Sequence, residues 1–247
     1  MSMSPHNSHS KRSKKVLRKL GVLRPPMPWH RPRVRRGGDE AVILLHGLWR
    51  SVWAMEPMAQ YLNGCGYQTI NCPYASFKLS LSEMVDQFSH FVREQCKEAK
   101  KVHFVTHSLG GVVVRQLLQQ LESDKIGHVV MLAPPHQGSE IVDWLQSYNL
   151  HRVLGPAGNF LSTSSMEALD TKLPDAIPVA VIMGKQSLLP FFRRMLDQQN
   201  DGIVSVERGQ VAGTNQFEII EADHTYISSN EDAMSMTEHF LRTGSLH

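Results

Sequence analysis

The stretch Thr106–Gly111 has the residue types and the spacing of a nucleophilic site. It follows an apolar run at Val102–Val105 and leads into a second one, so a strand, a sharp turn and a helix are expected in that order. A serine at the tip of such a turn keeps its hydroxyl accessible, and the turn requires small residues two positions before and after it. Gly110 meets this requirement, whereas Thr106 is β-branched where glycine is usual. The pattern predicts Ser108 as a nucleophile.

A serine hydroxyl is a weak nucleophile, so a base must take its proton and an acid must orient that base. The five-residue pattern alone also fits the start of a buried helix, and the prediction therefore depends on these partners. His224 is the predicted base, because it is the only histidine in the loop after the last expected strand. His239 falls inside the closing helix. His103 and His107 belong to the strand and turn around Ser108, where packing or hydrogen bonding is expected of them.

Asp201 is the predicted acid. It lies before Gly202 in a turn beyond the expected strand at 179–183, although an Asp-Gly pair is also a general turn signal. Asp197 and Glu207 are weaker alternatives, and Asp223 adjoins the predicted base, where neighbouring side chains point apart. The order serine, aspartate, histidine along the chain is the one that a strand–turn–helix nucleophile requires.

Two backbone N–H groups are expected to stabilise the oxyanion that forms when the serine attacks a carbonyl. One belongs to Leu109, directly after the nucleophile and at the start of a helix. The other is assigned to Leu48, in a loop that follows the first inner strand. Gly47 beside it would let the backbone approach the reacting carbonyl.

Apolar side chains near these positions are candidates for an acyl pocket, although aromatic residues more often belong to a core. Trp49 and Trp53 follow the predicted oxyanion loop, and Trp144 and Leu145 belong to an expected insertion over the site.

Alternating strands and helices are expected to position these residues. Apolar runs predict strands, and apolar spacing of three to four residues predicts helices. The expected strands cover 41–45, 67–71, 102–105, 128–132, 179–183 and 217–220. The expected helices cover 53–63, 81–98, the run Val112–Leu118 after the serine, and 229–242. This alternation predicts an α/β fold with a mostly parallel central sheet and helices on both faces. Residues 139–175 are expected to form a small helical insertion with one or two helices.

The first 38 residues differ in composition from the domain expected at 39–247. Residues 1–36 hold eleven of the chain's 26 lysines and arginines and none of its 23 acidic residues. Such a segment is expected to be a solvated arm; contact with an anionic membrane surface is a second possibility and a transit peptide a third. No recognition module for nucleic acid accompanies it.

Composition excludes several other classes of protein. No apolar run reaches the roughly 18–20 residues of a membrane-spanning helix, and no secretory signal is evident. A cytoplasmic location is therefore expected. Cys65, Cys72 and Cys96 are odd in number and lack metal-ligand spacing, which indicates reduced thiols.

With these parts in place, the chain resembles the α/β-hydrolases, and within them a bacterial lipase- or esterase-like subfamily. The resemblance spans Ala41 to Leu241 and is carried by Leu44–Leu48, His107–Gly111, Leu132–Ser139, Gly155–Gly158, Asp201–Glu207 and His224–Thr225. It implies a triad on Ser108, Asp201 and His224, with neither metal nor organic cofactor.

The expected activity is hydrolysis of a carboxylic ester, of a small molecule or a lipid, through an acyl-enzyme. The same triad would serve an acyltransferase or a thioesterase. A binding protein that kept the scaffold without catalysis is a further alternative, because fold alone does not determine activity.

Overall fold

The apolar runs of the sequence become the inner strands of one sheet. The computed structural model describes residues 23, 31–121, 123–169, 171–188, 196 and 198–247. Within them, seven strands pair in the order β1-β3-β2-β4-β5-β6-β7, and all neighbours are parallel except β1 and β3. The strands are β1 (Arg33–Arg35), β2 (Glu40–Leu45), β3 (Gln68–Cys72), β4 (Lys101–His107), β5 (Ile126–Leu132), β6 (Val179–Gly184) and β7 (Gln216–Ile220). The predicted α/β class is confirmed.

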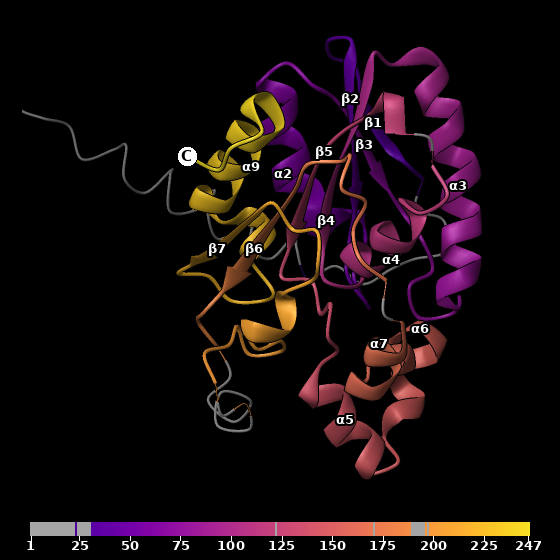
Figure 1. Cartoon of the computed structure of the whole chain (residues 1–247), viewed down its shortest axis with the longest axis vertical. Helices are drawn as coiled ribbons and strands as arrows, with labels where there is room; N and C mark the ends of the chain where they lie inside the picture. The colour runs from indigo at the N-terminus through magenta and orange to yellow at the C-terminus, as the bar shows by residue number, and fades with distance from the viewer. Residues whose placement is uncertain (1–22, 24–30, 122, 170, 189–195, 197) are drawn as a thin grey trace, which may run out of the picture.

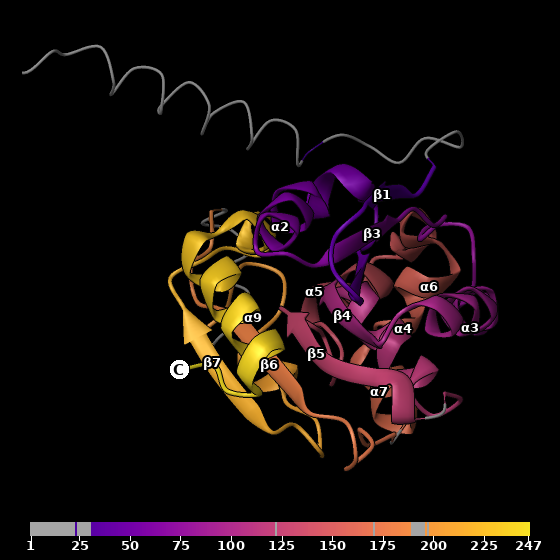
Figure 2. The same ribbon diagram turned by 90° about the horizontal axis from the view of Figure 1, so that it is seen from above.

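Helices cover both faces of this sheet. Figure 2 shows α2 (Val52–Gly64) and α9 (Glu231–Thr243) on one side, with α3 (Leu81–Glu98) and α4 (Leu109–Leu117) on the other. The inner strands β2, β4, β5 and β6 are almost fully buried between these layers. This double cover explains why they read as continuous apolar runs rather than as an alternating pattern.

Local signals place the helix ends close to where the sequence predicts them. Ser80 begins α3 with a capping box: its hydroxyl accepts from the backbone N–H of Glu83, whose carboxylate accepts from the N–H of Ser80. Asn230 caps α9 by accepting from two N–H groups of the first turn. Among the described residues, no helix combines the length and apolarity that crossing a bilayer requires.

Strand β1 corrects the predicted boundary of the basic arm. Arg33–Arg35 lies within the segment assigned to the arm, yet it pairs antiparallel with β3 at the edge of the sheet. Glu56 of α2, which is buried, forms ion pairs with Arg33 and Arg35 and accepts from the amide of Asn71. The folded domain thus begins before residue 39. The rest of the arm, apart from Leu23 and residues 31–38, lies outside the described residues.

The insertion at 139–175 contains more helix than expected. It comprises α5 (Glu140–Ser147), a 3-10 turn η2 (His151–Leu154), α6 (Gly155–Phe160) and α7 (Thr163–Leu169). Figure 1 shows α5, α6 and α7 grouped beyond one end of the sheet. Gly158 of α6 packs on Leu48, since a Cβ at residue 158 would lie 2.8 Å from the Leu48 side chain. The insertion therefore covers the loop that follows β2.

Candidate active site

Ser108 sits at the turn between β4 and α4 with a strained backbone. Its φ of 51° and ψ of −121° are rare for a residue with a side chain, and such strain is concentrated at functional sites. A Cβ at Gly110 would lie 2.7 Å from the Leu45 carbonyl oxygen, which explains the need for glycine there. Thr106 is fully buried in β4, so the turn forms with threonine at that position.

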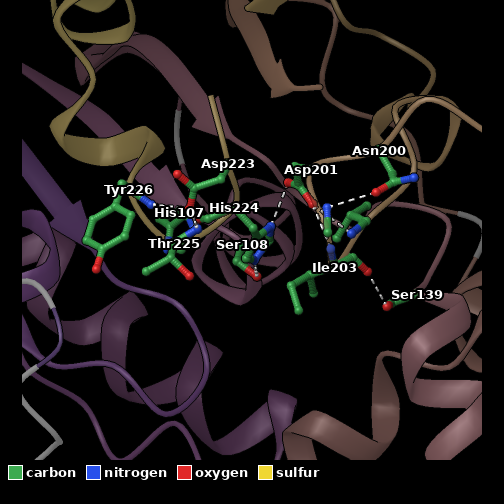
Figure 3. A network of polar contacts seen from close by, with 12 residues as sticks. His107, Ser108, Ser139, Asn200, Asp201, Ile203, Asp223, His224, Thr225 and Tyr226 are labelled. Atoms are coloured by element: carbon green, nitrogen blue, oxygen red, sulfur yellow. Dashed lines mark hydrogen bonds and ion pairs between the residues drawn. The ribbon is translucent and has the colours of Figure 1, made fainter. Parts of the chain in front are cut away.

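The predicted base and acid lie beside this serine. His224 Nε2 is 3.0 Å from Ser108 Oγ, and His224 Nδ1 is 2.7 Å from Asp201 Oδ2 (Figure 3). Since the carboxylate only accepts, Nδ1 carries the proton and Nε2 presents its lone pair to the serine hydroxyl. All three residues are less than 10% exposed, which strengthens these polar contacts.

A tight turn holds the Asp201 carboxylate in place. Oδ1 accepts from the backbone N–H groups of Ile203 at 3.0 Å and Val204 at 2.8 Å, leaving Oδ2 for the imidazole. Gly202 has a φ of 97°, which permits the turn. The alternative acid Glu207 is exposed in the 3-10 turn η3 (Glu207–Gly209), and Asp197 lies outside the described residues.

Asp223, the remaining alternative, caps its own turn instead of reaching His224. Its carboxylate accepts from the N–H groups of Thr225 and Tyr226, as Figure 3 shows. Burial raises the pKa of Asp223 above its usual range, although these hydrogen bonds oppose the shift.

The two predicted oxyanion donors belong to segments that adjoin the serine. Leu109 is the first residue of α4, where a backbone N–H has no partner within the helix. Leu48 follows Gly47, whose loop lies against the elbow, the turn that carries Ser108 between β4 and α4: a Cβ at residue 47 would be 3.1 Å from Ser108 Cβ. The geometry thus brings the loop after β2 next to the serine.

The four predicted pocket residues occupy separate places. Trp49 is 49% exposed and stacks on Phe77, with ring centres 5.0 Å apart. The ring of Trp53 lies under the guanidinium of Arg33, whose Cζ is 4.4 Å from the ring centre, beside the edge strand β1. Trp144 and Leu145 are half-buried on α5. Of the four, Trp49 adjoins the predicted oxyanion residue Leu48 in the chain.

Arg50 is a residue of this region that the sequence analysis missed. Its Nη2 donates to Thr225 Oγ1 at 3.1 Å, which joins the loop after β2 to the residue following His224. Burial lowers the pKa of Arg50, while Tyr226 and Asp223 act in the opposite direction. The sequence offers one signal for Arg50, namely its position two residues after the predicted oxyanion residue Leu48. In the described part of the chain, no cluster of three or more His, Cys, Asp or Glu side chains is arranged to hold a metal ion.

Comparison with solved structures shows which fold this is. The lipase BlEst2 of Bacillus licheniformis, in its mature form, superposes with a TM-score of 0.74 at 19% identity, covering 87% of this chain and 98% of the lipase. The metagenomic carboxyl esterase MGS0156 superposes with a TM-score of 0.58 at 16% identity, over 82% of this chain and 68% of the esterase. The fold is that of the α/β-hydrolases, as the sequence predicts.

The family follows from the sequence comparison. The model of the palmitoyl protein thioesterase family matches residues 41–172, more than half of the chain, and the protein belongs to that family. The lysosomal thioesterase PPT2 of Mus musculus is 27% identical over 138 residues, which cover 49% of this chain and 45% of the mouse protein. The human PPT2 is 26% identical over 136 residues. The match thus spans less than half the length of these relatives.

Proposed function

We propose that the protein is a serine hydrolase that cleaves a carboxylic ester or thioester through an acyl-enzyme. The observation that carries the proposal is the hydrogen-bonded chain from Ser108 Oγ to His224 Nε2, at 3.0 Å, and from His224 Nδ1 to Asp201 Oδ2, at 2.7 Å. A protein that only binds has no physical need for these three side chains in this order.

The proposed mechanism uses each of these groups in turn. Ser108 attacks the carbonyl carbon while His224 accepts its proton, and Asp201 stabilises the imidazolium that forms. The N–H groups of Leu48 and Leu109 donate to the oxyanion. His224 then protonates the leaving group as the bond to it breaks. Water, deprotonated by the same imidazole, releases the acid from Ser108.

Thioester cleavage is the favoured form of this chemistry. The palmitoyl protein thioesterase family model and the thioesterases among the sequence relatives support it, whereas the lipase and esterase neighbours share only the fold. An apolar acyl pocket that includes Trp49 remains part of the proposal. Esters and thioesters of matched acyl chains, from acetyl to palmitoyl, distinguish the two bond types and test the pocket. A strict preference for acetyl would contradict an apolar pocket.

Replacement of the serine tests the proposal directly. In Ser108→Ala, turnover of a chromogenic ester and of a matched thioester should vanish, together with labelling by a fluorophosphonate, because no nucleophile remains. A suitable control is Ser228→Ala, since Ser228 is buried but donates to the carbonyl oxygen of Ala54. Persistent labelling of the Ser108 variant would remove this residue from its role.

Two expectations about location remain predictions. Contact between the basic arm and an anionic membrane concerns residues that mostly lie outside the described part of the chain, and liposome binding before and after deletion of residues 1–30 tests it. The cytoplasmic location also stays untested, and the matching relatives are named as lysosomal proteins.

A further inference from the structure

His107 forms a buried contact with the backbone of the proposed base. It is the last residue of β4 and directly precedes Ser108, and only 2% of it is exposed. Its Nε2 lies 2.8 Å from the carbonyl oxygen of His224. A carbonyl oxygen only accepts, so Nε2 must carry the proton and donate it. The two imidazole rings lie 4.9 Å apart and are tilted by 50° (Figure 3).

The surroundings keep this imidazole neutral. Burial, followed by the charges of His224 and Arg50, holds the pKa of His107 well below its usual range. With its proton on Nε2, the ring has an unprotonated Nδ1, which finds no hydrogen-bond partner among the described residues. That atom faces the loop after β2, because a Cβ at Gly47 would lie 3.0 Å from it. His107 thus supplies a hydrogen-bond donor without adding a positive charge beside His224.

The backbone of His224 is therefore held from two sides. Its N–H donates to the carbonyl oxygen of Asp201 at 3.1 Å, and its carbonyl oxygen accepts from His107 at 2.8 Å. The bond from Nδ1 to Asp201 orients the ring, but the ring can reach Ser108 only if the main chain below it stays in place. We propose that His107 is a positioning residue that fixes the backbone of His224 relative to the nucleophile. This inference rests on the proposed function.

The contact has a consequence for the reaction cycle. Once Ser108 Oγ is bonded to the acyl carbon, it no longer donates a proton to His224, so that link between the elbow and the base weakens. The bond from His107 does not involve the reacting atoms and persists through both half-reactions. Because it preserves geometry rather than contacting the substrate, its loss should lower kcat far more than it raises KM.

Replacement of His107 by a residue without a donor tests the proposal. In His107→Leu, kcat for a chromogenic ester should fall about 10- to 100-fold while KM stays within about twofold, since small displacements of a catalytic group cost rates of this order. In His107→Gln, the side-chain amide can donate in place of the imidazole, and most of the lost kcat should return. His107→Met serves as the donor-free variant if the leucine variant does not fold.

A matched control separates positioning from general stability. His103 lies in the same strand and is 3% exposed, but its ring contacts His128 and Glu40 at the other end of β4. His103→Leu should lower the melting temperature and leave kcat within about twofold, because its contacts lie away from the triad. The proposed function is judged separately, by wild-type turnover and by the inactivity of Ser108→Ala. With that turnover established, a folded donor-free variant with unchanged kcat, or a glutamine variant no better than it, would overturn the role of His107.

Discussion

At the scale of single residues, Asp201 shows how one carboxylate can serve both local structure and chemistry. One oxygen closes the turn through the N–H groups of Ile203 and Val204, and the other faces the imidazole of His224. The turn itself is a local property of an Asp-Gly pair. The contact with His224 is not, because the two residues are 23 positions apart and belong to different loops.

Asp201→Asn should separate these two tasks. The amide oxygen can still accept from the turn, so the melting temperature should change little. Turnover should fall about 10³- to 10⁴-fold, because a neutral amide neither stabilises the imidazolium nor enforces the required tautomer. Steady-state kinetics combined with thermal unfolding checks both parts. A variant that retains wild-type turnover would shift the role of acid to another residue.

At the scale of elements, the insertion is joined to the body of the fold by close backbone contacts. Gly155 begins α6 with a φ of 69°, and a Cβ there would lie 2.0 Å from the carbonyl oxygen of Phe77. Phe77 in turn stacks with Trp49, beside the predicted oxyanion loop. Any other residue at position 155 would force the start of α6 away from Phe77. The position of α6 over that loop thus depends on glycine.

Gly155→Ala should destabilise the protein by more than about 1 kcal/mol, since it adds both a steric overlap and an unfavourable φ. Gly64→Ala is the matched control: it lies at the end of α2, and an added Cβ would meet no atom within 4 Å. Urea unfolding of the two variants measures the difference. Equal stabilities would show that α6 can shift away from Phe77 at little cost.

At the scale of the whole molecule, buried neutral histidines make stability depend on pH. Burial lowers the pKa of His136 to about 3, and burial is also the main reason why that of His103 is about 4. In the unfolded chain both would titrate near 6.5. Below that pH the unfolded state binds more protons than the folded state, so the free energy of unfolding falls as the pH decreases.

His136→Leu should therefore weaken the pH dependence of stability. As the pH falls from 6.5 to 5, the slope that each such histidine contributes rises toward a limit of roughly 1.4 kcal/mol per pH unit, and the variant should lose one of these contributions. Urea unfolding at several pH values in this window measures the slope. Identical slopes for the variant and the wild type would mean that His136 becomes protonated in the folded protein.

Much of the fold was predictable from the sequence, because its signals are local. Strands buried on both faces appear as apolar runs, and the capped amphipathic helices carry their own periodicity, so the predicted α3 matches at both ends. The strained turn at Ser108 was likewise visible in six consecutive residues. The sequence by itself thus determined the order of the inner strands and their covering helices, the fold class and the position of the turn at Ser108.

Contacts between distant segments were decided only by the tertiary structure. The three-residue segment Arg33–Arg35, with two arginines around one valine, shows no strand pattern in the sequence. It becomes β1 because β3 offers an open edge and Glu56 offers a buried carboxylate. The placement of Asp201 rather than Glu207 beside His224, and the bond from His107 to the carbonyl of His224, also depend on loops that meet across the sheet. Local patterns report the backbone conformation of neighbours in the chain, whereas these contacts depend on how the strands are ordered and where their ends converge.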